Sequence, residues 1–355
     1  MKEYRNILAY ALVNLGDVVL VTGALALLKR AYPEAKITLM VKPTVQEAVL
    51  NNPVIDEVMI FGYKAKEKSW RQTIKMLKEI RRRHFDLAIS FDRKLRPALL
   101  AWLAKIPTRV GPSKVFGQND SRVTLLYTDV AQINYDLDKH LQRETYQDIV
   151  RHITGQTESA MPVMAQTEAI NRKRAQKLKA KVGVASKYIM LCVKGTFVLK
   201  TWPKEYFAEL AKRLSERYRA AFLIVGAPGD KDYADEVMTA IKNEVGEEVG
   251  IVNLCGQTAL SDLTALAEIT DLFVTVDTGA AHVAATVGRP MVVVYGCTHP
   301  DRWHPANDNA IVLTTDESCS PCSYRAEECL SAPRPNCLYN LTPDAVFTAC
   351  QKLLG

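Results

Sequence analysis

The chain has 355 residues, of which 48% are hydrophobic and 24% charged, with a formal net charge of +7. These proportions are those of a soluble globular protein, and the length fits two domains of about 150 to 180 residues each. The positive charge favours anionic partners such as phosphorylated small molecules or anionic lipid. Nucleic acid is not expected as a partner, because no long Lys/Arg block with interleaved aromatic residues occurs.

The first apolar stretch, residues 6–33, carries Asn14 and Asp17 near its centre. A central Asp costs about 2.5–3.5 kcal/mol in a membrane helix, so this stretch is not expected to span a membrane. No small-residue cleavage site follows it, and no run of about 18 unbroken apolar residues occurs elsewhere. We therefore expect a cytoplasmic protein.

Short β-branched runs alternate with segments of helical period in the first half of the chain, which is typical of parallel βαβ units. Strands are expected near 6–13, 36–42, 56–61, 85–91 and 108–110, and helices near 18–31, 69–83, 94–104 and 138–153. The polar segment 154–170 has no apolar period and contains a proline. It is the best candidate for a linker between two domains.

The same alternation begins again after this linker. Strands are expected near 187–193, 220–226, 250–253, 271–276 and 290–295, and helices near 168–182, 203–218, 229–245, 260–269 and 279–287. The pattern predicts a second doubly wound domain, and each domain should bind ligands at the carboxyl ends of its strands. A long loop, 297–340, precedes a last helix at 342–354 that begins with Thr342 as N-cap.

Asp17 follows the first expected strand, at the turn into the first helix. One interpretation is a helix cap or first-turn acid, which the helix dipole favours. The other is a general base at the place where a ligand binds. Gly16 allows a close approach of the backbone, but no GxGxxG motif is present, so a dinucleotide fingerprint is not supported.

Several junctions in the second half suit an anionic ligand. Lys200 lies in the loop after 187–193, either as a point charge for a phosphate or as a solvated surface lysine. The junction after 271–276 offers unpaired backbone N–H groups at a helix start, although Asp277 could be only a cap and His282 only a core residue. Asp230 or Asp232 could accept from a ribose hydroxyl, with helix capping as the alternative.

Four of the eight cysteines, Cys319, Cys322, Cys329 and Cys337, follow the pattern C-x2-C-x6-C-x7-C. In a cytosolic chain such a cluster suits a metal better than two disulfides, and a thiolate quartet suits zinc or iron. The irregular spacing leaves a reduced loop without metal as the alternative. Because the loop is Pro-rich and poor in apolar residues, a metal would supply its folding free energy.

Motifs along nearly the whole chain resemble glycosyltransferase family 9, the bacterial ADP-heptose:lipopolysaccharide heptosyltransferases. They are LGDVVLVTGALALLKRAYP, LAKIPTRVG, KTWP, GQTALSDLTAL from Gly256, DTGAAHVAATVGRP, and the P-x2-W-x-P of residues 300–305. The resemblance implies an α/β GT-B fold with two Rossmann-like domains facing across a cleft. It implies residues 1–165 as the acceptor-binding domain and 166–341 as the donor-binding domain, with the Cys-rich loop at 315–340. Residues 342–355 would then form a helix that crosses back to the first domain.

The resemblance further implies an inverting transfer of heptose from ADP-heptose to an anionic glycolipid of the lipopolysaccharide inner core. Asp17 matches the family's proposed general base, and Lys200 and the loop Asp277–Gly279 match residues that hold the donor diphosphate. The expected donor-binding residues are Thr196, Lys200, Asp230, Gly256, Asp277, Thr278, Gly279 and His282. Arg93, Lys94 and Arg96 are candidates for the acceptor's phosphates or carboxylates, with plain surface solvation as the alternative.

Transfer of this kind needs a base on one face of the sugar and positive charge with N–H donors on the other. Because Lys200 and helix N-termini can replace a divalent metal, no cofactor is expected for the transfer itself. Peripheral contact with the inner face of the inner membrane is expected. Three alternatives stay open: a protein or another glycan as acceptor, a non-catalytic nucleotide-binding protein, and a metal-dependent oxidoreductase, for which no cofactor fingerprint is visible.

Overall fold

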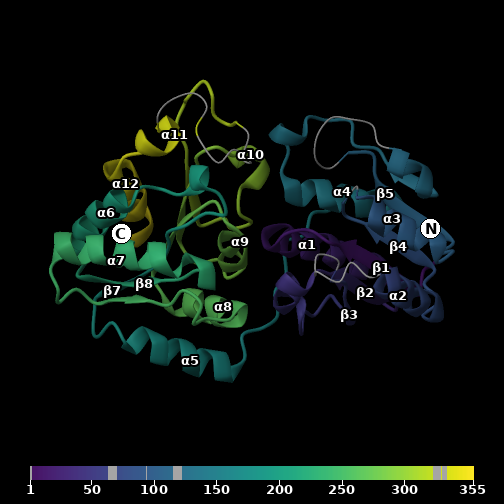
Figure 1. Cartoon of the computed structure of the whole chain (residues 1–355), viewed down its shortest axis with the longest axis horizontal. Coiled ribbons are helices and arrows are strands. Elements are labelled where there is room, and N and C mark those ends of the chain that lie inside the picture. The colour runs from purple at the N-terminus through teal and green to yellow at the C-terminus, as the bar shows by residue number, and fades with distance from the viewer. Residues whose placement is uncertain (1, 63–69, 93, 115–121, 323–328, 330–333) are drawn as a thin grey trace. The chain divides into compact units, whose positions relative to one another are not determined.

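The computed structural model describes residues 2–62, 70–92, 94–114, 122–322, 329 and 334–355. The chain divides into two compact units, Met1–Gln166 (unit 1) and Thr167–Gly355 (unit 2). Each unit holds a six-stranded sheet in which the paired strands run parallel (Figure 1). The alternation of strand and helix patterns in the sequence thus corresponds to two α/β units.

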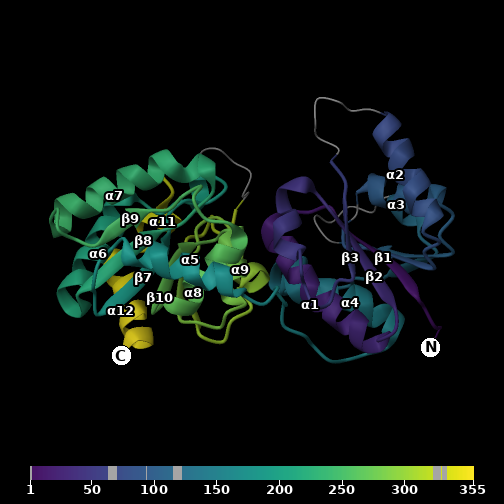
Figure 2. The same cartoon turned by 90° about the horizontal axis from the view of Figure 1, so that it is seen from below.

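Unit 1 has the strand order β3-β2-β1-β4-β5-β6. Helices α1 and α4 lie on one face of this sheet, and α2 and α3 lie on the other (Figure 2). The strands are β1 (Asn6–Ala11), β2 (Lys36–Val41), β3 (Glu57–Ile60), β4 (Leu87–Ser90), β5 (Thr108–Pro112) and β6 (Asp129–Ala131). The helices are α1 (Leu15–Ala31), α2 (Trp70–Arg82), α3 (Leu95–Leu103) and α4 (Gln142–Thr154), with short 3₁₀ turns η1 (Pro43–Val49), η2 (Arg122–Leu126) and η3 (Leu137–Lys139).

Helix α1 explains the apolar start of the sequence. It is buried continuously from Asp17 to Leu28, because it packs on the sheet and also against α4. A helix covered on both sides needs apolar residues around most of its circumference. None of the described helices is long and apolar enough to cross a membrane.

Unit 2 has the strand order β12-β11-β10-β7-β8-β9, the same topology as unit 1 with strand numbers increased by six. Its strands are β7 (Lys187–Cys192), β8 (Ala220–Ile224), β9 (Ile251–Asn253), β10 (Leu272–Val276), β11 (Met291–Val294) and β12 (Ala310–Leu313). Its helices are α5 (Ala169–Ala180), α6 (Lys204–Tyr218), α7 (Lys231–Val245), α8 (Leu260–Ile269), α9 (Gly279–Ala285), α10 (Pro300–Trp303), α11 (Asn336–Tyr339) and α12 (Pro343–Leu354), with 3₁₀ turns η4 (Val198–Lys200) and η5 (Pro228–Asp230).

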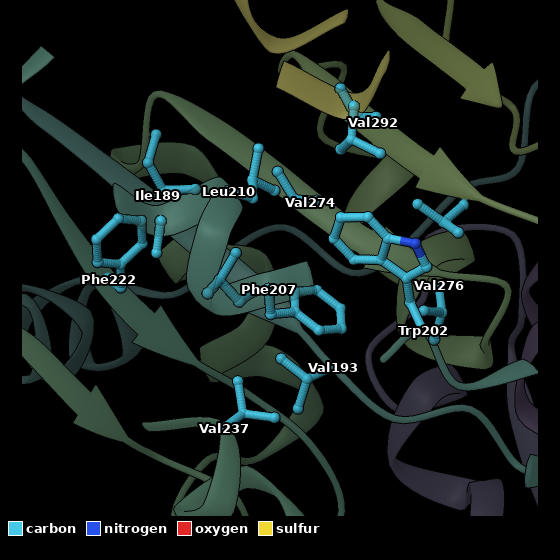
Figure 3. Close-up of a cluster of buried hydrophobic side chains, with 14 of the residues drawn as sticks. Ile189, Val193, Trp202, Phe207, Leu210, Phe222, Val237, Val274, Val276 and Val292 are labelled. Carbon is cyan, nitrogen blue, oxygen red and sulfur yellow. The ribbon is translucent and has the colours of Figure 1, made fainter. Parts of the chain in front are cut away.

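The core of unit 2 gathers around Trp202, which is fully buried (Figure 3). Its ring meets that of Phe207 edge to face at 4.9 Å between centroids. The indole Nε1 donates to the Leu341 carbonyl at 2.9 Å, so the polar end of the buried ring is satisfied. This contact fixes the loop before α6 to the segment before α12.

Helix α12 packs on the core of unit 2. Val346, Ala349 and Cys350 are buried in the core cluster of unit 2, and α12 contacts α6, β10 and β11. These contacts anchor residues 342–355 to unit 2, and the crossing to the first domain that the resemblance implies stays a prediction. The apolar face of α12 is covered by its own unit.

Two strands were not predicted, β6 and β12. Both lie at a sheet edge, where a strand pairs with one neighbour only. The three residues of β6 are too few to show a period, and the four of β12 lie within the long stretch predicted as loop. Elsewhere the predicted strand and helix positions agree with the structure to within a few residues.

Candidate active site

The strand order defines one switch point in each sheet, between β1 and β4 in unit 1 and between β7 and β10 in unit 2. Ligands of doubly wound sheets bind beside the carboxyl ends of the strands at such a point. Asp17 and Lys94 follow the two strands at the first switch point, and Lys200 and Asp277 follow the two at the second. Each unit therefore has its predicted residues at the place that the topology favours.

Asp17 lies in the first turn of α1, and its exposed fraction is 9%. The N-cap position belongs to Asn14, so Asp17 is a first-turn acid and not the cap. Tyr146 of α4 donates from Oη to Asp17 Oδ1 at 2.8 Å, and its ring packs edge to face on Phe91. A buried carboxylate that is held by a hydroxyl 129 positions away has a fixed orientation.

Asp92 is a second carboxylate at this switch point, and sequence reasoning missed it. It follows β4 and is 1% exposed, and burial raises the pKa of its carboxyl against the opposing effect of Lys94. Lys94 Nζ lies 3.2 Å from Asp92 Oδ2 and donates to the Leu12 carbonyl at 2.8 Å. Its ammonium therefore joins the ends of β1 and β4 while half of its side chain stays exposed.

The other predicted acceptor residues divide into two cases. Arg96 lies over the ring of Phe61 at 6.0 Å from its centroid. Together with Lys94 it lines a small pocket of about 240 Å³ that Leu12, Leu95 and Pro97 complete. Arg93 lies outside the described residues. Lys94 and Arg96 are thus brought to one pocket at the first switch point.

In unit 2 the second switch point holds a buried ion pair. Lys200 Nζ lies 2.6 Å from Asp277 Oδ2, and Thr298, after β11, donates from Oγ1 to the same oxygen at 2.7 Å. The side chains of Lys200 and Asp277 are only 14% and 6% exposed. Lys200 is therefore not the solvated surface lysine of the alternative interpretation, because its ammonium is held against a carboxylate.

Gly195 allows this arrangement. A Cβ at this position would lie 2.4 Å from Lys200 Cβ and 2.8 Å from the Lys200 carbonyl oxygen. Any larger residue would force the loop apart and move the ammonium away from Asp277. Thr196, next to it, is exposed at the loop surface.

The junction after β10 has the predicted local structure. Thr278 is the N-cap of α9, and its side chain accepts from Ala280 N at 3.2 Å. Asp277 is therefore not the cap of this helix, and its carboxylate is used by Lys200 and Thr298 instead. Gly279 is the first residue of α9, and His282 is buried one turn further on.

Asp230 has a capping role, as the alternative interpretation expected. Its Oδ2 accepts from Ala227 N at 2.9 Å, and Lys194 Nζ lies 3.5 Å from Oδ1. Gly256 adopts a positive φ of 73° and donates to the Gly226 carbonyl, so it supports the turn that carries Asp230. Contact of Asp230 and Gly256 with the donor stays a prediction.

The four clustered cysteines are free thiols. Burial raises the pKa of the Cys322 thiol, and Cys319 and Cys329 add to the rise. Burial also raises the pKa of Cys337 to about 11. Yet no group of three or more His, Cys, Asp or Glu side chains among the described residues is arranged to hold a metal ion. The donor chemistry fits a soft metal, but the described positions do not form a finished ligand set.

Comparison with known proteins identifies the family to which the chain is similar. The family model of glycosyltransferase family 9 (heptosyltransferase) matches residues 73–331. Lipooligosaccharide heptosyltransferase 2 of Haemophilus influenzae is 27% identical over 318 residues, which cover 87% of this chain and 88% of that protein. The glycosyltransferase family 9 structure from Veillonella parvula has a TM-score of 0.84 at 24% identity, covering 100% of this chain and 98% of that one.

The structure of Escherichia coli ADP-heptose lps heptosyltransferase II has a TM-score of 0.79 at 22% identity and covers 98% of each chain. These likenesses confirm the predicted α/β GT-B fold with its two parallel six-stranded sheets. The family match extends over well over half of the chain, from α2 into the Cys-rich loop. The chain therefore belongs to glycosyltransferase family 9, the heptosyltransferase family.

Proposed function

We propose that this protein transfers a heptose from ADP-heptose to an anionic glycolipid acceptor of the lipopolysaccharide inner core, with inversion at the anomeric carbon. Family membership supports glycosyl transfer, and the relatives' known activities as lipooligosaccharide and ADP-heptose transferases support the heptose donor and the lipopolysaccharide acceptor. The observation that carries the proposal is the buried carboxylate of Asp17 at the first switch point, held by Tyr146 at 2.8 Å.

Asp17 acts as the general base. As an acceptor hydroxyl attacks the anomeric carbon, a carboxylate must remove its proton. Asp17 suits this role because its orientation is fixed by Tyr146 and it stands where a doubly wound sheet binds ligands. One displacement forms the new glycosidic bond and breaks the bond to the diphosphate, so the configuration inverts and no second acid is required.

Lys200 stabilises the leaving diphosphate. Negative charge develops on the departing oxygen, and a pre-positioned ammonium lowers the free energy of that transition state. Asp277, itself held by the Thr298 hydroxyl, keeps Lys200 in place before the donor arrives, so little reorganisation is needed. Thr278 and Gly279 add hydroxyl and backbone groups beside it. This charge arrangement makes the transfer independent of a divalent metal.

Lys94 and Arg96 bind anionic groups of the acceptor at their pocket in unit 1. Asp92 orients the Lys94 ammonium toward this pocket, as Asp277 orients Lys200 in unit 2. The protein works on the cytoplasmic side, in peripheral contact with the inner membrane where the lipid acceptor resides. Any metal at the cysteine cluster is structural.

A donor and acceptor screen tests this function. The protein is incubated with ADP-heptose or another nucleotide sugar, together with lipid A–Kdo or heptosylated core, and released ADP is measured. We expect release only with ADP-heptose and a core acceptor, an unchanged rate in EDTA, and an inverted anomeric signal in the product. ADP binding without turnover on any acceptor would favour a non-catalytic nucleotide-binding protein, and turnover only on a protein or another glycan would replace the acceptor.

A further inference from the structure

The net positive charge of the protein comes from unit 1. Unit 1 holds 25 Lys/Arg and 17 Asp/Glu residues, whereas unit 2 holds 21 and 22. Helices α2 and α3 lie on one side of the sheet of unit 1 (Figure 2), and residues 70–83 and 94–105, which contain them, carry nine Lys/Arg against one acid. Helix α2 contains one acid, Glu79, which pairs with Arg82 and Arg83, and α3 and η2 contain none.

The same side exposes large apolar side chains. The exposed fractions are 40% for Ile74, 57% for Leu95, 49% for Trp102 and 80% for Leu125. Leu95 and Trp102 are seven residues apart on α3, which places them on one face of the helix, with the half-buried Leu99 between them. Helix α3 thus has a second apolar stripe besides the one it packs on the sheet.

These residues belong to neighbouring elements. Arg81 of α2 donates from Nη2 to the Leu103 carbonyl at the end of α3 at 2.8 Å, and η2, which carries Leu125, contacts α3. Lys75 and Lys78 of α2 and Lys105 after α3 are exposed around them. We call this the α2–α3 surface, defined by Ile74, Leu95, Trp102 and Leu125 and by Lys75, Lys78 and Lys105.

We propose that the α2–α3 surface docks the protein on an anionic lipid bilayer. Lysines beside a Trp and aliphatic side chains are the composition of a peripheral membrane surface: the charges meet anionic headgroups, and the apolar groups enter the headgroup boundary. Nucleic acid would use the lysines but leave Ile74, Leu95 and Leu125 without a partner. A symmetric dimer through this surface would set like charges against each other.

The surface explains how a soluble fold reaches an acceptor that is anchored in lipid. That purpose rests on the proposed function, but docking itself does not. The small pocket lined by Lys94 and Arg96 borders Leu95, so an acceptor headgroup near the bilayer would meet those cations. The docked bilayer and the acceptor pocket are thus on the same side of unit 1.

Vesicle co-sedimentation tests the proposal without any turnover. We expect the protein to pellet with vesicles of phosphatidylcholine and phosphatidylglycerol, to stay in solution with phosphatidylcholine alone, and to be released by salt. The variant Lys75→Gln/Lys78→Gln should weaken partitioning by about fivefold per lysine, and Trp102→Ser/Leu125→Ser should weaken it even at low salt. Unchanged melting temperatures show that the variants remain folded.

Helix α5 of unit 2 offers a matched control, because it exposes Lys173, Lys177 and Ile170 in a similar pattern. Lys173→Gln/Lys177→Gln and Ile170→Ser should leave vesicle binding unchanged. Equal losses of vesicle binding in the α2–α3 and α5 variants would show that only the overall charge of the protein matters, and this would overturn the proposal. Equal binding to neutral vesicles would overturn it too, as would α2–α3 variants that change the oligomeric state but not the binding. The α2–α3 variants should turn over a deacylated, water-soluble acceptor as fast as the wild type does. If neither the wild type nor the variants turned over this acceptor, the proposed enzymatic function would be contradicted, but the membrane docking would not.

Discussion

The two units place a buried aspartate at equivalent points of the same topology, but each pairs it with a lysine from a different strand and buries that lysine to a different extent. Asp92 follows β4, the fourth strand of unit 1, and Asp277 follows β10, the fourth strand of unit 2. Both carboxylates are buried, and each pairs with a lysine, at 3.2 Å for Lys94 and 2.6 Å for Lys200. The Lys94 side chain is 52% exposed, and that of Lys200 is 14% exposed.

This difference matches the ligands proposed for the two units. A buried ammonium in a low dielectric exerts a strong, fixed attraction, which suits the charge that develops on a leaving diphosphate. A half-exposed ammonium can move to meet anionic groups at different positions on an acceptor, but it attracts each of them less strongly. Unit 1 also carries a second buried carboxylate, Asp17, after β1, the other strand of its switch point. This carboxylate is the one proposed as the general base.

The largest effect is expected from Asp17→Asn. The substitution keeps shape and neutral hydrogen bonding but removes the proton acceptor, so turnover should fall by about 10²–10⁴-fold with ADP binding unchanged. Single-turnover measurement with saturating donor checks this. Turnover like that of the wild type in the Asn variant would remove Asp17 from the reaction.

Lys200→Ala should weaken ADP binding by about 10- to 100-fold, since a charge-assisted hydrogen bond is worth about 1.5–3 kcal/mol. Because Asp277 would stay buried without its cation, the melting temperature should also fall. Titration calorimetry on the folded variant separates the two effects. Lys204→Ala, which removes an exposed lysine paired with Glu236, is the matched control. Equal ADP affinity in all three proteins would contradict the assignment.

Tyr146→Phe should lower turnover about tenfold, because Asp17 loses the hydrogen bond that orients it. A double-mutant cycle checks the cause: in the Asp17→Asn background, Tyr146→Phe should have no further effect. Tyr135→Phe is the control, because Tyr135 donates to Asp148 at 2.7 Å in the same unit. Additive losses in the double variant would show that Tyr146 acts through something other than Asp17.

Asp92→Asn should raise the acceptor KM several-fold and leave ADP binding unchanged, since Lys94 loses its orienting charge. The burial that raises the Asp92 pKa favours the protonated form in the folded state. The protonated carboxyl of Asp92 therefore contributes its full share to the free energy of unfolding at pH values below the pKa that it has in the unfolded chain. That share is lost as the pH rises through the higher pKa that it has in the folded protein. The stability of the Asn variant relative to the wild type should accordingly increase from acid to neutral pH, as thermal unfolding across that range would measure. A fixed difference at all pH values would contradict the burial argument.

The sequence predicts where a residue lies within a strand, helix or loop more reliably than it predicts which distant residues it contacts. Asp17, Lys200 and Asp277 were predicted because each follows a clear apolar strand, and position after a strand is a local property. Asp92 follows a strand too, but its burial and its pairing with Lys94 depend on tertiary packing, which the local sequence does not show. Tyr146 could not be linked to Asp17, because the bond joins α1 to α4 across 129 positions. Lys200 gave no sign in the sequence that it is buried.

The last prediction has the smallest expected effect on transfer and concerns the cysteine loop. If Cys319, Cys322, Cys329 and Cys337 bind zinc or iron, protein purified under reducing conditions should contain about one ion per chain. Cys322→Ser should then lower the metal content and the melting temperature, because metal binding contributes local folding free energy, while most of the transferase activity remains. Ser320→Ala is the control: it removes the hydrogen bond to the Gly296 carbonyl in the same loop but keeps every thiol, so its metal content should not change. Far less than one ion per chain in the wild type, with all four thiols reacting freely, would show that the cysteines are reduced and hold no structural ion. The backbone bond from Cys322 N to the Cys297 carbonyl at 3.0 Å would then be one of the contacts that hold the loop on unit 2.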